Sequence, residues 1–166
     1  TPLSGLAELE RAFKDIAEEF AMDWQFHDAA RRTKVLIAVS KYGHCLNDLL
    51  HRWKTGVLPV EIVGVVSNHE DMREMVEWHN LPYHHLPVSA ETKSKQEKEI
   101  LAIMENTDAE LLALARYMQI LSNQMCQQLT GKAINIHHSF LPGFKGAKPY
   151  HQAYERGVKI IGATAH

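Results

Sequence analysis

The sequence has little of what marks secreted, membrane-spanning or nucleic-acid-binding proteins. Only two of its 166 residues are cysteine, too few for a disulfide framework or a cysteine-rich zinc site and typical of reduced cytosolic thiols. The longest apolar runs, such as residues 35–39 and 62–66, are far shorter than the roughly 20 residues that span a bilayer. No basic segment followed by an apolar one indicates a secretion signal. A formal net charge of −2 favours neither nucleic acid nor an anionic membrane as partner, and we expect a cytoplasmic protein.

Glycine-rich phosphate loops and metal-binding motifs are missing as well. The turn at residues 41–45 has a single glycine, so it matches neither the dinucleotide-binding nor the Walker pattern. The adjacent histidine pairs at 84–85 and 137–138 point to opposite faces of a strand and form no ready chelate. We therefore expect no metal and no dinucleotide cofactor.

The first 33 residues differ in pattern from the rest. Apolar residues at helical spacing predict an amphipathic helix that starts near Ser4-Gly5. Met22, Trp24 and Phe26 then alternate with polar residues, which predicts a half-buried strand. One helix and one strand cannot bury their own apolar faces. We interpret residues 1–33 as the C-terminal part of a small α+β domain plus a linker. Since the sequence starts at Thr1 and stops at His166 directly after a strand-like run, we expect both ends to be truncated.

From residue 34 onward, strand and helix patterns alternate. We expect strands at residues 35–40, 60–67, 82–87, 110–115, 133–137 and 158–165, with helices between them. Ser122 is expected to cap one helix, Pro149 to begin another, and Cys126 to be buried. This alternation predicts an α/β fold with a doubly wound, mostly parallel sheet. Ligands of such sheets bind at the carboxyl ends of the strands, which here means residues 41–45, 116–121 and 135–148.

The densest candidate site lies at the end of the fifth expected strand. Asn135 and His137 fall on one face of that strand because its side chains alternate. An amide and an imidazole can both donate hydrogen bonds to a developing oxyanion, and imidazole can also transfer a proton. The alternative is that both residues merely bond loops or backbone. Met118, Ile120 and Leu121 likewise read either as core residues or as an exposed strand end that grips a flat heterocycle.

A wider set of residues resembles the folate-dependent formyltransferase family. The resemblance rests on Asn135-Ile136-His137, Ser139, Leu141-Pro142, Gly146, Pro149, Ala153, Gly157 and Gly162-Ala163-Thr164-Ala165-His166. Residues 117–122 resemble the folate-contacting segment of that family, and the match covers residues 34–166. It implies the formyltransferase fold for this catalytic domain. Residues 1–33 resemble the final helix and strand of an N-terminal ACT regulatory domain.

Within the family, residues 137–142 and 40–50 look most like formyltetrahydrofolate deformylases. The resemblance implies hydrolysis of 10-formyltetrahydrofolate to formate and tetrahydrofolate, with Asn135 and His137 as catalytic residues. It implies substrate contacts by Met118, Gln119, Ile120, Leu121, Gly146 and His166. A third catalytic residue of the family, an aspartate, would follow His166. No cofactor besides the folate substrate is implied.

Other readings stay open. A formyltransferase that passes the formyl group to a small amine, such as glycinamide ribonucleotide, is the nearest alternative, although bulky Tyr42, His44 and Cys45 stand in the first turn and His138 follows the catalytic histidine. A folate-binding relative without catalysis is a second alternative. A transfer-RNA formyltransferase fits worse, because no basic surface is indicated. ACT domains often pair and bind an amino acid, so we expect a homo-oligomer with a possible amino-acid effector such as methionine or glycine.

Overall fold

The computed structural model describes residues 2–28, 30–137, 143, 148–160 and 162–165. The chain divides into two compact units, residues 1–32 and residues 33–166, which we describe separately.

The first unit contains one long helix, α1 (Pro2–Glu19). It begins earlier than the expected Ser4-Gly5 start, and proline is favoured in the first helical turn because its missing N–H would have no partner there. Phe13 packs edge-on against Trp24 and Phe26, with ring centroids 5.2 and 5.4 Å apart. On the same helix, Leu9 and Ile16 are 57% and 46% exposed, so only part of the apolar stripe is covered within the described residues.

The prediction of a strand around residues 22–26 is wrong, because this segment has no regular secondary structure. Trp24 and Phe26 are half-buried and Met22 is exposed, so most of the alternation in burial is present without the strand. A strand is defined by hydrogen bonds to a neighbour, and the described part of this unit offers only a helix beside it.

The second unit is built on a six-stranded sheet in the order β3-β2-β1-β4-β5-β6. Its strands are β1 (Lys34–Val39), β2 (Glu61–Ser67), β3 (Tyr83–His85), β4 (Leu111–Leu114), β5 (Ala133–His137) and β6 (Thr164–Ala165). All neighbouring pairs are parallel except β5 and β6, which are antiparallel. This confirms the doubly wound, mostly parallel sheet.

The last expected strand is much shorter than predicted. Among the described residues of this stretch, 158–160 and 162–165, only Thr164 and Ala165 pair with a neighbouring strand, through His137 and Ile136 of β5. Val158 instead bonds back to the Ala153 carbonyl at the end of a helix, and Ile160 is 75% exposed. The apolar composition of this stretch favours a strand, but pairing decides whether one forms.

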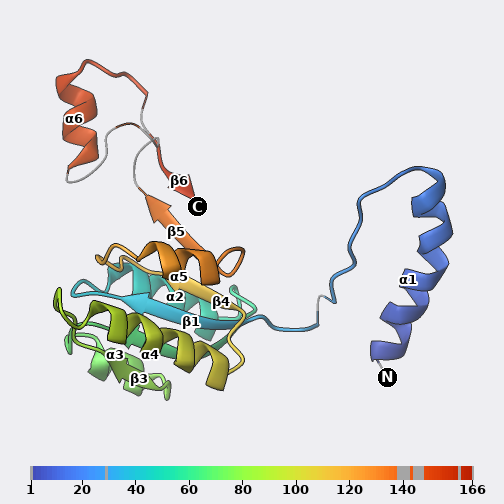
Figure 1. The fold of residues 1–166 in the computed structure, drawn as a ribbon, viewed down its shortest axis with the longest axis horizontal. Helices are drawn as coiled ribbons and strands as arrows, with labels where there is room; N and C mark the ends of the chain where they lie inside the picture. The colour runs from blue at the N-terminus through green and yellow to red at the C-terminus, as the bar shows by residue number, and fades with distance from the viewer. Residues whose placement is uncertain (1, 29, 138–142, 144–147, 161, 166) are drawn as a thin grey trace. The chain divides into compact units, whose positions relative to one another are not determined.

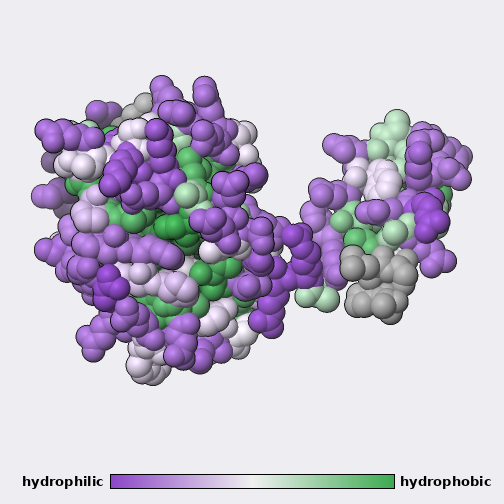
Figure 2. All heavy atoms as spheres, turned by 60° about the horizontal axis from the view of Figure 1, so that its bottom comes forward, coloured by the Kyte–Doolittle hydropathy of each residue, from purple (hydrophilic) through white to green (hydrophobic). Residues whose placement is uncertain are grey.

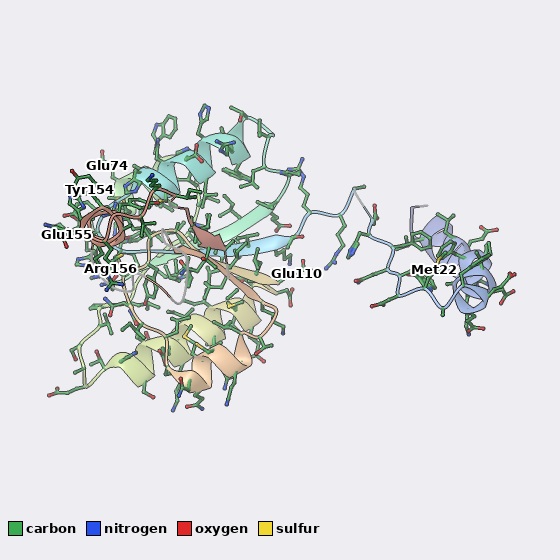
Figure 3. All side chains as sticks on the ribbon, turned by 90° about the horizontal axis from the view of Figure 1, so that it is seen from above. Met22, Glu74, Glu110, Tyr154, Glu155 and Arg156 are labelled. Atoms are coloured by element: carbon green, nitrogen blue, oxygen red, sulfur yellow. The ribbon has the colours of Figure 1, made fainter. Side chains whose placement is uncertain are left out.

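Helices cover both faces of the sheet (Figures 1 and 3). They are α2 (His44–Lys54), α3 (Arg73–Trp78), α4 (Lys93–Asn106) and α5 (Asn123–Gln128). A further helix, α6 (Pro149–Glu155), follows β5 in the chain. Residues of α2 and α3, such as Leu46 and Val76, pack with Ile37 of β1 on one face. Residues of α4 and α5 pack on the opposite face of the same strands. Because β1 is covered on both sides, its residues 35–39 are buried, as a continuous apolar run predicts.

Two helix boundaries confirm the sequence prediction, and one burial prediction is wrong. The Ser122 side chain caps α5 by accepting a hydrogen bond from the Met125 backbone N–H, and Pro149 opens α6. Cys126, expected to be buried, is exposed. The inner face of α5 holds Met125 and Leu129, which are four residues apart, and Cys126 lies about 100° round the helix from Met125.

The surface of the larger unit mixes hydrophilic and hydrophobic side chains, as the face in Figure 2 shows. Among the described residues no helix is both long enough and apolar enough to cross a membrane.

Candidate active site

The order of the strands brings the predicted site segments to neighbouring strand ends. The chain runs from β1 outward to β2 and β3, and then returns to place β4 on the other side of β1. The loops that follow β1 and β4 therefore lead to opposite faces of the sheet. The crevice between two such loops, at the carboxyl ends of the strands, is where open parallel sheets bind ligands. The end of β5 lies next, because Leu114 of β4 pairs with Asn135.

The register of β5 supports the alternation expected for its polar residues. Asn135 is half-buried, and it follows by two positions Ala133, which packs against the core under α4 and α5. Ile136 lies on the opposite face and is 68% exposed. The structure describes the backbone of His137, which pairs with Thr164, but its side chain lies outside the described part. Convergence of the two side chains on one point stays a prediction.

The loop after β4 presents apolar side chains outward. Met118 and Ile120 are 67% and 84% exposed, whereas Leu121 packs partly into the core and Gln119 is half-buried. Of the two readings that the sequence left open, a core position is wrong for Met118 and Ile120. Exposed apolar side chains at the carboxyl edge of a sheet are suited to a flat, partly apolar ligand.

The backbone of this loop is tied to distant parts of the chain. The Met118 N–H donates to Ser40 Oγ (2.9 Å), and Ser40 Oγ donates to Asn68 Oδ1 (2.8 Å). The Tyr117 hydroxyl donates to Gln96 Oε1 (3.1 Å). Both Ser40 and Tyr117 are buried, and burial raises the pKa of the Tyr117 phenol to about 12, so it stays protonated as a donor at neutral pH. The loop conformation is thus set by side chains far away in sequence.

At its other end the loop is held by a carboxylate. Glu97 Oε1 accepts a hydrogen bond from the Ser122 N–H (2.8 Å), and Glu97 Oε2 accepts one from Ser122 Oγ (2.5 Å). Glu97 is 7% exposed. The sequence reading missed this residue and Ser40. The only signal for Glu97 was its place one turn before the apolar Ile100 and Leu101, inside a highly charged segment.

The first turn, after β1, is occupied by side chains of this chain. The Arg116 guanidinium lies 4.8 Å from the Tyr42 ring centroid, and its Nη1 is 3.1 Å from His44 Nε2. Arg116 itself has a positive φ of 59°, a backbone conformation that is unusual for a residue with a Cβ. Tyr42 is 58% exposed and His44 is exposed as well, so whether these bulky residues exclude an acceptor stays a prediction.

Two predicted substrate-binding residues, Gly146 and His166, lie outside the described residues. The histidine pair of β3 has separate surroundings: burial lowers the pKa of His84, and His85 Nδ1 lies 2.8 Å from Glu70 Oε1. Among the residues that the structure describes, no three His, Cys, Asp or Glu side chains are placed to hold a metal ion.

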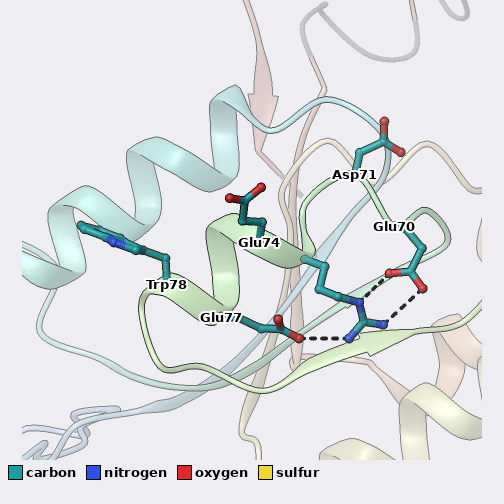
Figure 4. A pocket seen from close by; sticks show the side chains of 6 residues that line it. Glu70, Asp71, Glu74, Glu77 and Trp78 are labelled. Atoms are coloured by element: carbon teal, nitrogen blue, oxygen red, sulfur yellow. Dashed lines mark hydrogen bonds and ion pairs between the residues drawn. The ribbon is translucent and has the colours of Figure 1, made fainter.

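An open surface pocket of about 540 Å³ is found along α3 and the loop before it (Figure 4). It is lined by Glu70, Asp71, Arg73, Glu74, Glu77 and Trp78. Arg73 donates to Glu70 (2.6 Å) and Glu77 (3.1 Å), while Trp78 is 76% exposed. None of the predicted site residues lines this pocket, and Arg73 pairs with two of its four carboxylates, Glu70 and Glu77.

Comparison with known proteins agrees with this architecture. The formyl transferase family matches residues 33–166, so the chain belongs to that family. The chain is 57% identical over 161 residues to a protein of Corynebacterium sp. (strain P-1) named formyltetrahydrofolate deformylase, covering 97% of the chain and 56% of that protein. A crystal structure of formyltetrahydrofolate deformylase from Burkholderia mallei is 59% identical, with a TM-score of 0.81, and covers 96% of the chain and 57% of that structure.

A phosphoribosylglycinamide formyltransferase structure from Anaplasma phagocytophilum is less similar. It is 29% identical, has a TM-score of 0.69, and covers 82% of the chain and 64% of that structure. The chain spans little more than half the length of the deformylases it matches.

Proposed function

We propose that the chain is the main part of the catalytic domain of an enzyme that hydrolyses 10-formyltetrahydrofolate to formate and tetrahydrofolate. The observation that carries the proposal is the 57% identity, over nearly the whole chain, to a protein named formyltetrahydrofolate deformylase. The site at the ends of β4 and β5 supports it, since an exposed apolar loop lies there beside a strand with Asn135 and His137. Such an enzyme would supply formate for purine synthesis and balance the one-carbon pool.

The reaction needs water to add to the formyl carbon. The new C–O bond gives a tetrahedral intermediate with a negatively charged oxygen, and the proton that the attacking water loses passes to the solvent. The C–N bond then breaks while the departing nitrogen takes a proton, which leaves formate and tetrahydrofolate. We assign the Asn135 carboxamide and the protonated His137 imidazole as donors to that oxygen, with His137 also delivering the proton. Met118, Gln119, Ile120, Leu121, Gly146 and His166 are assigned to folate binding.

Removal of either donor tests the assignment. In the full-length protein, Asn135→Ala and His137→Ala are expected to lower kcat for formate release about a hundredfold or more, because one oxyanion donor contributes ~3 kcal/mol to the barrier. KM should change little, since the donors act in the transition state. Asn106→Ala and His51→Ala, both at exposed positions, are matched controls. Equal losses in folate affinity and in kcat/KM, with kcat unchanged, would instead indicate that Asn135 and His137 bind folate without stabilising the transition state. Absence of formate release by the unmodified protein would indicate a folate-binding relative without catalysis.

Formate release without any added amine separates hydrolysis from transfer. A hydrolase forms formate and tetrahydrofolate from 10-formyltetrahydrofolate and water alone, whereas a transferase needs an acceptor such as glycinamide ribonucleotide. The bulky first turn, with Arg116 stacked on Tyr42, favours water. We further propose that the first unit belongs to an ACT-like regulatory domain that binds an amino acid, and that the enzyme is a cytoplasmic homo-oligomer needing no cofactor besides folate.

A further inference from the structure

Two consecutive polar side chains of α4 are buried although nothing in the proposed reaction uses them. Gln96 and Glu97 are 4% and 7% exposed. They lie in the segment Lys93-Ser94-Lys95-Gln96-Glu97-Lys98-Glu99, whose composition is that of a solvent-exposed helix face. Burial of a carboxylate carries a large desolvation cost, so the position calls for an explanation.

The two side chains fasten the two ends of one loop. Glu97 accepts both hydrogen bonds that Ser122 can donate, from its N–H and from its hydroxyl. Gln96 accepts from the Tyr117 hydroxyl and donates to the Leu86 carbonyl (2.6 Å). No buried side-chain nitrogen or oxygen among the described residues lacks a partner. Both side chains under the loop therefore have their hydrogen-bond partners, and these bonds hold Glu97 and Gln96 in one orientation.

Between its two fastened ends the loop carries two exposed apolar side chains, Met118 and Ile120. Because Met118 and Ile120 are exposed, packing in the core does not fix their positions. Their positions therefore depend on the conformation of the loop backbone. A carboxylate with two hydrogen bonds to one serine holds that conformation more rigidly than apolar packing, because its bonds fix direction as well as distance.

We propose that Glu97, together with Gln96, is a positioning residue for folate binding, which holds residues 117–122 so that Met118 and Ile120 meet the substrate. The proposal rests on the proposed function for the identity of the ligand. The Glu97 carboxylate is buried and bonds Ser122, so it acts through the loop. Its loss should therefore weaken binding and leave the chemical step intact.

The test compares variants of the full-length protein. Glu97→Leu removes both acceptors and is expected to raise KM for 10-formyltetrahydrofolate about tenfold or more, the effect of losing a hydrogen bond to a charged group, with kcat within about twofold. Glu97→Gln keeps an acceptor for the Ser122 N–H, and KM should return to within about threefold of the unmodified protein. Glu105→Leu, on an exposed position of the same helix, is the matched control and should leave KM unchanged.

A second variant keeps the proposal testable if Glu97→Leu does not fold. Tyr117→Phe retains the ring and removes only the bond to Gln96, so KM should rise several-fold with kcat unchanged. An unchanged KM in folded Glu97→Leu or Tyr117→Phe overturns the proposal, as does a fall in kcat without a rise in KM. A lower melting temperature with unchanged KM would show a purely structural role and overturns it too.

Equilibrium binding of tetrahydrofolate separates this proposal from the proposed function. If the unmodified protein releases no formate yet binds tetrahydrofolate, the proposed function fails, and the same variants still test positioning through the dissociation constant. If it releases formate and the variants bind tetrahydrofolate as tightly as it does, only the positioning role fails.

Discussion

Replacement of Ser40 by alanine should destabilise the larger unit through two lost hydrogen bonds. The Ser40 hydroxyl accepts from the Met118 N–H and donates to Asn68 Oδ1, at 2.9 and 2.8 Å, and Ser40 is 3% exposed. Each bond contributes about 1 kcal/mol net, so Ser40→Ala should lower the free energy of unfolding by about 2 kcal/mol. For a protein of this size that corresponds to a fall of roughly 4–8 °C in melting temperature.

Thermal and urea unfolding followed by circular dichroism measure this effect. Ser94→Ala, at an exposed position of α4, is the control and should stay within about 0.5 kcal/mol of the unmodified protein. A double-mutant cycle with Asn68→Ala isolates the Ser40–Asn68 bond and should give a coupling near 1 kcal/mol. A loss in Ser40→Ala no larger than in the control would refute the view that this hydroxyl ties the loop to β1.

Two further predictions concern single positions. A Cβ on Gly43 would lie 2.2 Å from Met72 Sδ, so the flexible end of that side chain would have to shift, whereas a Cβ on Gly5 would meet nothing within 4 Å. Gly43→Ala should therefore lower the free energy of unfolding by about 1 kcal/mol, the low end of overpacking costs, and Gly5→Ala should not lower it, as urea titration can check. Burial lowers the pKa of His84 below its ordinary value of 6.5, so the unfolded chain binds the proton more readily and stability should fall as pH drops below 6.5. His84→Gln should show less of this fall than the exposed control His51→Gln, and equal pH profiles would contradict the argument.

Much of the sheet could be predicted because its signals are local. The apolar runs at β1 and β2 predict strands that are covered on both faces, and Ser122 and Pro149 carry their helix signals within a few residues. A strand without a neighbour is different. The alternation at residues 22–26 and the apolar stretch at 158–160 both have strand composition, yet neither is paired in the described residues. Pairing depends on segments far away in sequence, which composition does not reveal.

The candidate site was predictable in part for the same reason. Asn135 and His137 are conspicuous because two groups of suitable chemistry stand two residues apart at the end of a strand, and residues 117–122 match a family motif. Periodicity could not decide whether Met118 and Ile120 point inward or outward. That depends on the hydroxyl of Ser40, 78 residues from Met118 in sequence, and on α4 beneath the loop.

The burial of Glu97 could not be predicted from the charge pattern of its segment. Residues 93–99 alternate basic, polar and acidic side chains, and such a run is ordinarily a solvated helix face. Here one acidic side chain turns inward because the loop after β4 brings the N–H and hydroxyl of Ser122 to it. The stability of a buried carboxylate requires those donors, and the loop conformation requires the carboxylate. The conformations of α4 and of the loop after β4 therefore depend on each other. A substitution at Glu97 or at Ser122 should shift Met118 and Ile120, although none of these hydrogen bonds involves their side chains.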